Sequence, residues 1–357
     1  MTDKNRVIAH VVGARPNFVK AAPLIKAINS TGIKQVLIHT GQHYSKNLSD
    51  DFFEVLNIPE PDYHLSIGSG THATQTAAVL EKIEPILSKV NPDIVVVYGD
   101  VNSTVAACLA AAKLQIKTAH IESGLRSFDK QMPEEINRLI VDHICDYCFV
   151  TEPSGLINLE NEGIEKDRMF FVGNTMIDTL KSTVEKVTCF DEDEFALLTC
   201  HRPSNVDNKE GLTKILEACK LSPIKVVFPV HPRTMQKMDE YGLLKYFSDL
   251  ENLVMCDPMS YTEFLGRMKN AKFVLTDSGG IQEETTALLV PCLTLRENTE
   301  RPVTIDIGTN VLIKDLRHLK EQIDKICCDD FKKGDIPKFW DGKASLRITE
   351  IIERILI

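Results

Sequence analysis

The sequence predicts an α/β protein made of two doubly wound parallel sheets. Short apolar segments rich in valine and isoleucine alternate with helical segments, a pattern typical of strand–helix–strand units. This pattern fills the first half of the chain and restarts near Phe171–Asn174. A length of 357 residues is also large for a single hydrophobic core. We therefore expect two domains, 1–172 and 173–343, followed by a C-terminal helix within 344–357.

The first half has five segments that we expect to be strands. They are apolar runs without alternating polar positions, as in strands buried on both faces of a sheet. These segments are Val7–Val12, Val36–His39, Ile94–Tyr98, Thr118–Ile121 and Tyr147–Thr151. The expected helices between them are Asn17–Ile28, Ser49–Leu56, Thr74–Val90, an alanine-rich stretch before Thr118, and Glu134–Ile144.

The second half repeats the alternation, with a helix expected at Ile281–Leu289. Polar residues follow its strands, and the carboxyl ends of parallel strands share one edge of a sheet, where ligands bind. A ligand site is therefore expected at that edge. The expected strands are Phe195–Thr199, Lys225–Val230, Leu253–Met255, Phe273–Leu275 and Pro291–Leu295.

Charge and composition exclude several classes of partner. The net charge is -10 and the basic clusters are short, so nucleic acid and anionic membranes are not expected partners. No apolar run reaches membrane-spanning length, and Met1–Ala9 lacks the apolar core of a signal peptide. Most of the ten cysteines lie in apolar segments, as reduced cytoplasmic thiols do. Cys145 and Cys148 form a lone CxxC pair without a second pair at zinc spacing, so we expect a core position and no metal site.

Three acids stand where a sheet of this kind binds ligands. Asp100 and Glu122 directly follow two neighbouring strands, and Glu134 begins a helix after a proline. With Arg126 and Arg138 nearby, the three carboxylates predict proton transfer on a charged substrate.

Each acid also has a structural explanation. Acids in the first turn of a helix favour its dipole, so one of Glu134 and Glu135 is expected to be structural. Asp100 is a candidate N-cap of the helix that follows it. Glu122 is harder to explain in this way, because a charge at the end of a buried strand needs a partner or a chemical role.

The loop Gly13–Pro16 is a candidate anion site. Glycine ends the first strand and proline opens the next helix, which leaves backbone N–H groups directed at the loop. Arg15 and Lys20 add positive charge there. The loop is not GxGxxG, and no dinucleotide fingerprint occurs elsewhere, so a nicotinamide cofactor is not expected.

The loop Asp277–Gly280 predicts a diphosphate site. Its glycines Gly279 and Gly280 let the backbone approach a ligand, and the following helix supplies N–H groups and a positive dipole end. Glu284, one turn later, is a candidate acceptor for ribose hydroxyls, unless it is an ordinary exposed glutamate. Phe264 is a candidate to stack on a base, although a core phenylalanine is commoner.

Histidines follow two strands of the second half. His201 and His231 are each followed by an arginine, Arg202 and Arg233, within two positions. They indicate a shared anion cleft, and the alternative is that they only cap turns. In the first half, Gln42 and His43 follow a strand and could line a cleft, although a polar loop is the default there.

Eight ordered motifs carry a resemblance to a known family. The chain resembles the non-hydrolysing UDP-N-acetylglucosamine 2-epimerases, which have two Rossmann-like domains arranged in the GT-B fold, with the active site in the cleft between them. The motifs are GARPNFVK (13–20), TGQHY (40–44), GDVNST (99–104), HIESGLRSFDKQMPEEINR (120–138), HRPSNVD (201–207), PVHPR (229–233), TDSGGIQEE (276–284) and TERP (299–302).

The resemblance implies an isomerase without cofactor or metal, acting on a nucleotide sugar. It implies a homodimer whose C-terminal helix, Ala344–Leu356, packs on the first domain. The residues implied for chemistry are Asp100, Glu122, Glu134 and His201. Those implied for UDP binding are Arg15, Lys20, Phe264, Ser278, Gly279, Gly280, Glu284 and Arg301.

The reaction that the resemblance implies is reversible C2 epimerisation of UDP-N-acetylglucosamine to UDP-N-acetylmannosamine, for cell-surface polysaccharide precursors. The hydrogen at C2 is not beside a carbonyl carbon. Elimination of UDP to a 2-acetamidoglucal and re-addition on the other face therefore suits a site with carboxylates and cations.

Some features leave alternatives open. QHYSKN at Gln42–Asn47 departs from the segment that binds a second, activating substrate molecule in some members. His43, His231 and Arg233 remain as candidates for such a second site. The alternative functions are epimerisation of a UDP-2,3-diacetamido-uronic acid, a hydrolysing epimerase that releases free sugar, and a GT-B glycosyltransferase, which would need an acceptor groove rather than three clustered acids.

Overall fold

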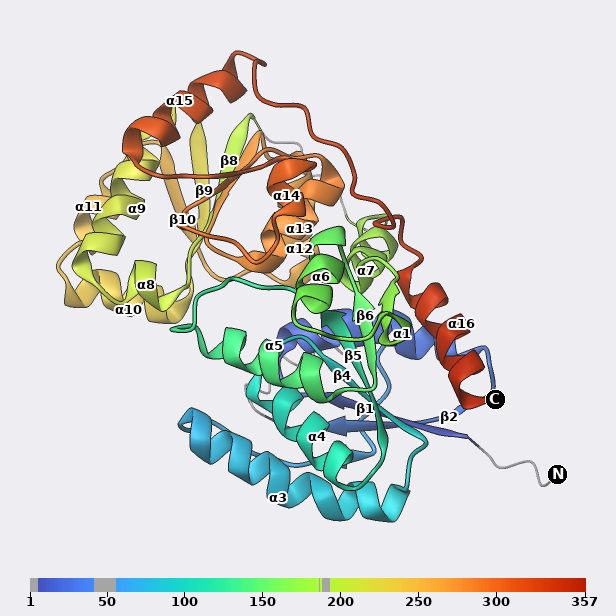
Figure 1. Cartoon of the computed structure of the whole chain (residues 1–357). Helices are drawn as coiled ribbons and strands as arrows, with labels where there is room; N and C mark the ends of the chain where they lie inside the picture. The colour runs from blue at the N-terminus through green and yellow to red at the C-terminus, as the bar shows by residue number, and fades with distance from the viewer. Residues whose placement is uncertain (1–5, 42–55, 186, 188–192) are drawn as a thin grey trace. The chain divides into compact units, whose positions relative to one another are not determined.

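The computed structural model describes residues 6–41, 56–185, 187 and 193–357 (Figure 1). The chain divides into two compact units, Met1–Ser182 with Lys338–Ile357, and Thr183–Pro337. We call these unit 1 and unit 2. Each contains one parallel sheet with helices on its faces, so the predicted fold class is confirmed. The expected helix between the third and fourth strands is α4, which begins at Asn102. The helix expected at Ser49–Leu56 lies, except for Leu56, outside the described residues.

Unit 1 contains a seven-stranded parallel sheet in the order β3-β2-β1-β4-β5-β6-β7. The order reverses direction between β1 and β4, as in a doubly wound sheet. Its strands are β1 (Val7–Val12), β2 (Lys34–His39), β3 (Tyr63–His64), β4 (Ile94–Tyr98), β5 (Lys117–Ser123), β6 (Tyr147–Val150) and β7 (Met169–Phe171).

Alternate residues of the central strands enter two different cores. Val95 and Val97 of β4 belong to the core under α3, α4 and α5, and Ile94 and Val96 to the core under α1 and α16. Burial on both faces explains why these strands are continuous apolar runs. The helices of unit 1 are α1 (Arg15–Asn29), α3 (His72–Val90), α4 (Asn102–Lys113), α5 (Pro133–Ile144), α6 (Pro153–Asn161), α7 (Thr175–Val184) and α16 (Ala344–Leu356).

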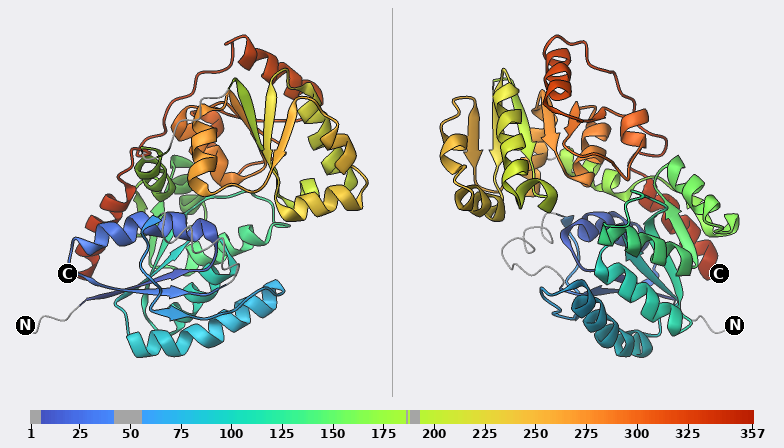
Figure 2. Two further views of the ribbon diagram at one scale, coloured as in Figure 1. Left: turned by 180° about the vertical axis from the view of Figure 1, so that it is seen from behind. Right: turned by 60° about the vertical axis from the view of Figure 1, so that its left-hand side comes forward.

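The C-terminal helix α16 completes unit 1. It lies beside α1 and contributes Ile348 and Ile352 to the core (Figures 1 and 2). Asp178 of α7 accepts hydrogen bonds from the N–H groups of Ala344 and Ser345, at 3.1 and 2.7 Å, and so caps this helix. The chain segment from residue 338 onward therefore belongs to the same folding unit as the first sheet.

Unit 2 contains a six-stranded parallel sheet in the order β10-β9-β8-β11-β12-β13. One face is covered by α9, α10, α11 and α15, which bury the main apolar core of the unit. The strands are β8 (Phe195–Thr199), β9 (Lys225–Pro229), β10 (Leu253–Cys256), β11 (Phe273–Thr276), β12 (Cys292–Thr294) and β13 (Asn310–Leu312). The helices are α8 (Pro203–Val206), α9 (Lys209–Leu221), α10 (Pro232–Glu240), α11 (Leu244–Ser248), α12 (Tyr261–Asn270), α13 (Gly279–Leu288), α14 (Val303–Asp306) and α15 (Leu316–Cys327).

The expected strands are present, with end positions shifted by one or two residues in several cases. Three strands were not predicted. They are β3, β7 and β13, of two, three and three residues, and each lies at an edge of its sheet. A segment this short carries too little periodicity to indicate a strand.

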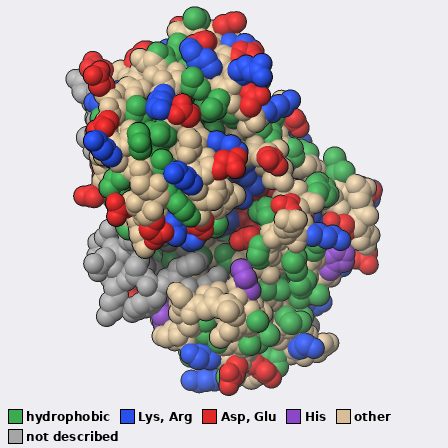
Figure 3. Space-filling view, turned by 90° about the vertical axis from the view of Figure 1, so that its left-hand side faces the viewer, with side chains coloured by type: hydrophobic (Ala, Val, Ile, Leu, Met, Phe, Trp, Pro, Cys, Tyr) green, Lys and Arg blue, Asp and Glu red, His purple; other side chains and the backbone are tan. Residues whose placement is uncertain are grey.

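The distribution of surface charge and the hydropathy of the helices bear on which partners the protein binds. Among the described residues visible in Figure 3, basic and acidic side chains are interspersed rather than gathered by sign. No helix in the described ranges is long and apolar enough to cross a membrane.

Candidate active site

Asp100 and Glu122 lie at the carboxyl ends of adjacent strands. β4 and β5 pair in parallel up to Tyr98 and Ile121, so the two acids follow at the same edge of the sheet. Glu122 has a φ of 79°, and the pairing of β5 with β6 is irregular between Ile121 and Ser123. A left-handed glutamate costs roughly 1–2 kcal/mol relative to an ordinary conformation. The irregularity turns the side chain of Glu122 out of the regular strand pattern.

The partner that Glu122 needs is Lys20. The Lys20 ammonium of α1 forms an ion pair with Glu122 Oε2, and the two side chains are only 6% and 3% exposed. A Cβ atom on Gly99 would lie 2.9 Å from Lys20 Nζ and 3.2 Å from Glu122 Oε2, and Gly99 has a φ of 62°. Glycine is therefore required where the backbone passes over this pair.

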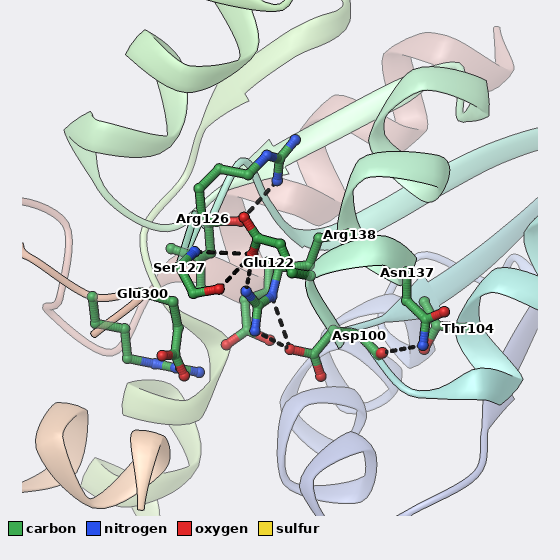
Figure 4. A network of polar contacts seen from close by, with 12 residues as sticks. Asp100, Thr104, Glu122, Arg126, Ser127, Asn137, Arg138 and Glu300 are labelled. Carbon is green, nitrogen blue, oxygen red and sulfur yellow. Dashed lines mark hydrogen bonds and ion pairs between the residues drawn. The ribbon is translucent and has the colours of Figure 1, made fainter. Parts of the chain in front are cut away.

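Asp100 is held from α5. Arg138 Nε and Nη2 lie 3.0 and 2.9 Å from Asp100 Oδ2, and Asn137 donates to the Asp100 carbonyl at 2.8 Å (Figure 4). The Asp100 side chain remains 26% exposed, so its carboxylate is accessible to a ligand. The alternative that Asp100 caps α4 is wrong, because Val101 occupies the N-cap position.

The adjacent acids Glu134 and Glu135 have different environments. Glu135 is buried and accepts hydrogen bonds from Ser127 N, Ser127 Oγ and Phe128 N at 2.9–3.0 Å, and it pairs with Arg138 at 2.5 Å. Glu134 is half-buried, and within the described ranges no hydrogen bond or ion pair joins it. Glu135 is thus the structural one of the two. Its spacing of three from Arg138, on the apolar side of the helix, is the sequence signal that could have identified it.

The loop after β1 differs from its sequence-based prediction. Asn17 Oδ1 accepts from the N–H groups of Gly13 and Ala14, both at 3.0 Å, and Asn17 Nδ2 donates to Tyr98 O at 2.8 Å. Two of the donors expected to face an anion are therefore already used inside the loop. The side chain of Arg15 lies outside the described residues.

In unit 2, Asp277 fixes the loop that carries His201. This buried carboxylate follows β11 and accepts from His201 N at 3.1 Å, Arg202 N at 3.0 Å and Asn205 Nδ2 at 2.9 Å. The His201 ring is 54% exposed, with Nδ1 3.7 Å from Asp277 Oδ1. The histidine is thus presented to solvent at the carboxyl edge of the sheet.

The loop Ser278–Gly280 has the geometry of an anion site. α13 begins at Gly279, and the side chain of its N-cap, Ser278, makes no capping hydrogen bond. A Cβ atom on Gly279 would lie 2.6 Å from Arg301 Nη1, so a larger residue at this position would displace the guanidinium from the helix N-terminus. Arg301 is nearly buried and is paired with Glu300 and, at 2.8 Å, with Glu283.

Further arginines surround Glu300. Arg296 Nη2 lies 2.7 Å and Arg202 Nη2 3.8 Å from its carboxylate. Burial and the charge of Arg296 lower the pKa of Arg202 below its ordinary value. Three arginines, Arg202, Arg296 and Arg301, thus converge on the one carboxylate of Glu300. The TERP motif thus supplies Glu300 as an organising residue that the sequence analysis did not single out.

Glu284 is buried on α13, so the alternative of an exposed glutamate is wrong. Tyr261 donates a hydrogen bond to Glu284 Oε1 at 3.0 Å. Burial raises the pKa of Glu284 to about 7, the charge of Glu283 adds to this, and the hydrogen bond from Tyr261 opposes it. Phe264 is half-buried on the neighbouring helix α12.

The candidate second-site residues are partly described. Gln42 and His43 lie outside the described residues. His231 is the N-cap of α10 and accepts from Arg233 N at 3.2 Å, as in the capping alternative, and Arg233 pairs with Asp207. In the part of the chain that the structure describes, no three His, Cys, Asp or Glu side chains form a group that could hold a metal ion.

The comparisons with known proteins identify the family. The sequence model of the family UDP-N-acetylglucosamine 2-epimerase matches residues 26–353, nearly the whole chain. The chain belongs to this family. The matched range contains every candidate site residue named above except Arg15 and Lys20, which precede it.

Individual members of the 2-epimerase family align along both units. A UDP-N-acetylglucosamine 2-epimerase of Methanocaldococcus jannaschii is 43% identical, over 96% of this chain and 97% of the relative. A UDP-2,3-diacetamido-2,3-dideoxy-D-glucuronate 2-epimerase of Pseudomonas aeruginosa is 38% identical, over 98% and 99%. The crystal structure of the M. jannaschii enzyme in complex with UDP-GlcNAc and UDP matches with a TM-score of 0.90 at 41% identity, covering 98% of this chain and 99% of that one.

Proposed function

We propose that this chain is a non-hydrolysing epimerase that interconverts UDP-N-acetylglucosamine and UDP-N-acetylmannosamine. The observation that supports this most is the joint presence of two sites. Unit 1 carries the acids Asp100 and Glu122 at adjacent strand ends, and unit 2 carries an arginine-lined helix N-terminus. The first suits proton transfer at a sugar carbon and the second suits a diphosphate.

The reaction we propose is elimination followed by re-addition. A carboxylate removes the proton from C2, the C1–O bond breaks, and UDP leaves with its electron pair while the C1–C2 double bond of 2-acetamidoglucal forms. In the second half, a protonated carboxyl group delivers a proton to the other face of C2, and UDP re-forms the bond at C1. The reaction is therefore balanced without an oxidant or a reductant.

Residues of unit 1 are the candidates for the base and the acid of this reaction. Lys20 neutralises the charge of the buried Glu122. Asp100 is accessible although Arg138 holds it, and Glu134 is half-exposed at the start of α5. We propose that Asp100, Glu122 and Glu134 provide the base and the acid for the two faces of C2.

The residues of unit 2 hold the nucleotide. We propose that the N-terminus of α13 and Arg301 bind the diphosphate, and that His201 stabilises its charge as it leaves. Glu284 would accept ribose hydroxyls, and Phe264 would stack on the base. We further infer a cytoplasmic homodimer that supplies a precursor of cell-surface polysaccharide.

A second candidate substrate has specific support. The P. aeruginosa relative, at 38% identity, is by its name a 2-epimerase of a UDP-diacetamido-glucuronate. Such a substrate shares UDP and the C2 chemistry with UDP-N-acetylglucosamine, so the two sites described above would serve it equally well.

One NMR experiment in D₂O distinguishes these functions. Incubated with UDP-N-acetylglucosamine, the protein should produce UDP-N-acetylmannosamine carrying deuterium at C2, because the enzyme acid exchanges with solvent before it returns the proton. Free N-acetylmannosamine would indicate a hydrolysing enzyme. Product that retains the C2 hydrogen completely would exclude exchange-mediated elimination. Turnover of the diacetamido-uronic acid alone would select the second substrate.

A further inference from the structure

His120 connects two parts of unit 1 that carry acids. It lies in β5, two residues before Glu122, and is fully buried. Its Nε2 lies 2.8 Å from the carbonyl oxygen of Gly99, and its Nδ1 lies 2.7 Å from Asp142 Oδ1. Both partners are acceptors, so both ring nitrogens donate hydrogen bonds.

Asp142 continues the connection from the buried side of α5. Its second oxygen, Oδ2, accepts from Gly124 N at 3.0 Å and from Arg126 Nη1 at 2.7 Å. Although burial acts to raise the pKa of Asp142, His120 and Arg126 hold it below its ordinary value. Arg126 is fixed in turn by Glu162, at 2.8 and 2.6 Å.

These contacts join the two turns that present the acids. Gly99 directly precedes Asp100, and Gly124 is two residues after Glu122. Gly99, Glu122 and Gly124 all have left-handed φ values, of 62°, 79° and 83°. Backbone pairing between the strands ends with the hydrogen bond from Gly99 N to Ile121 O at 3.0 Å. Beyond this bond, the relative position of the turns depends on side-chain contacts. The path Gly99 O–His120–Asp142–Gly124 N is a direct link of that kind.

We propose that His120 and Asp142 form a positioning pair that sets the separation of the Asp100 and Glu122 carboxylates. This proposal rests on the proposed function, in which both acids act on one carbon. Neither residue touches substrate in it. Displacement of a catalytic group by about 1 Å lowers a rate by about 100-fold, so a link between the two turns controls the rate.

Two substitutions of His120 each remove one of its two hydrogen bonds. The amide of His120→Asn lies near the position of Nδ1, so it keeps a donor for Asp142 and loses the one for Gly99. The amide of His120→Gln lies near the position of Nε2, so it keeps a donor for Gly99 and loses the one for Asp142. Because the pair acts only when both turns are connected, each variant should lower kcat by about 10- to 100-fold. KM should change by less than about threefold, since the proposed UDP site lies in unit 2.

Asp146→Asn is a matched control. Asp146 binds the other end of the same strand, where it accepts from Thr118 N at 2.9 Å and pairs with Lys117 at 2.6 Å. Its substitution should lower the Tm and leave kcat within about twofold, because it lies away from the acids. All rates are measured well below the Tm of each variant, so that lost stability does not lower the folded fraction.

The outcomes separate the two hypotheses. Normal kcat in both His120 variants, with a lowered Tm, would overturn the positioning role. If neither variant folds, Glu162→Gln loosens only Arg126 and should still lower kcat by about 3- to 10-fold, and an unchanged kcat would overturn the role. Wild-type protein inactive on every UDP-sugar would overturn the proposed function instead. In that case crystal structures of the His120 variants test the positioning role by themselves. If Asp100 and Glu122 occupy the same positions as in wild type, the role is refuted.

Discussion

Glu122 combines a left-handed backbone, a buried charge and a lysine partner. A residue without a chemical role gains nothing from this arrangement, since an aliphatic residue in a regular strand would avoid both the strain and the burial of a charge. Asp100 is held less completely, by Arg138 and Asn137, and remains accessible. At this scale the structure therefore separates acids that are available for chemistry from acids that are used to build the fold.

The first prediction uses the neighbours Glu134 and Glu135. Glu134→Gln should lower kcat by about 10²–10⁴-fold, the usual effect of one general acid or base, and leave the Tm unchanged. Glu135→Gln should instead lower the Tm, because its carboxylate accepts three hydrogen bonds and an ion pair. Steady-state kinetics and thermal melts measure both. An active Glu134→Gln enzyme would remove Glu134 from the mechanism.

The second prediction concerns the pH dependence of stability. The pKa of Glu284 is about 7 in the folded state and 4.5 for an ordinary exposed glutamate, so the folded state binds the proton more tightly. Its contribution is therefore fully present below pH 4.5 and is lost as pH rises through 7, by about 3 kcal/mol. Glu284→Gln removes this titration. The difference between the Tm of Glu284→Gln and the Tm of wild type should therefore shift in favour of the variant as pH rises from 5 to 8.

Tyr261→Phe provides the control for the pH range over which Glu284 titrates. Without the hydroxyl donor the pKa of Glu284 should rise further, so the loss of stability should continue to higher pH and become larger. Parallel Tm profiles for wild type and Glu284→Gln between pH 5 and 8 would contradict the assignment.

Residue roles were predictable from sequence only in part. Asp100 and Glu122 were found because chain order places both at strand ends. Lys20 as the partner of Glu122 was not found, because that contact joins α1 to β5 across about a hundred residues. Asn17, His120 and Asp142 act through hydrogen bonds to backbone groups, and no sequence pattern distinguishes such residues from polar residues on the surface.

At the scale of helices and strands, the longer an element is, the more accurately the sequence predicted its position. Central strands with continuous apolar residues were located to within a few residues, whereas the edge strands β3, β7 and β13 are too short to show a pattern. The helix α16 was located correctly, but its place in unit 1 came from family resemblance. Its attachment depends on Asp178, 166 residues earlier, which the sequence alone does not connect to it.

The third prediction tests this attachment. Asp178→Ala removes two hydrogen bonds from the N-terminus of α16 and should destabilise unit 1 by about 1–2 kcal/mol. Asp315→Ala is the control, because Asp315 caps the exposed start of α15 with one bond to His318 N at 2.8 Å, and should cost about half as much. Urea denaturation measures both. Equal effects would mean that burial of the α16 cap adds nothing.

At the scale of the whole molecule, the two units should respond to acid in opposite ways. Unit 2 contains Glu284, whose titration favours the folded state at low pH. Unit 1 contains His10 and His39, whose pKa values are lowered to about 4, chiefly by burial. Trp340 is the single tryptophan of the chain and is fully buried in unit 1, where it donates to Thr151 O at 3.0 Å. Its fluorescence therefore reports on unit 1 alone.

The fourth prediction is the acid sensitivity of unit 1. His10 lies between Tyr98 Oη at 2.6 Å and Gln35 Oε1 at 2.9 Å, and is neutral when buried. Its pKa is about 4 in the folded state and 6.5 when exposed, so the unfolded state binds more protons between these values. The stabilisation is complete above pH 6.5 and is lost as pH falls through 4, at a cost of about 3 kcal/mol.

His10→Gln removes this proton uptake and keeps a polar side chain between the same two partners. Whatever its stability at pH 7, the unfolding free energy of this variant should fall less steeply than that of wild type between pH 6.5 and 4. Urea titrations followed by Trp340 fluorescence at several pH values give the two slopes. His143→Gln, at an exposed histidine of the same unit, is the comparison variant. Equal slopes for wild type and His10→Gln would mean that acid reaches unit 1 through other groups, with His39, which stacks on Phe18 and His64, the next to replace.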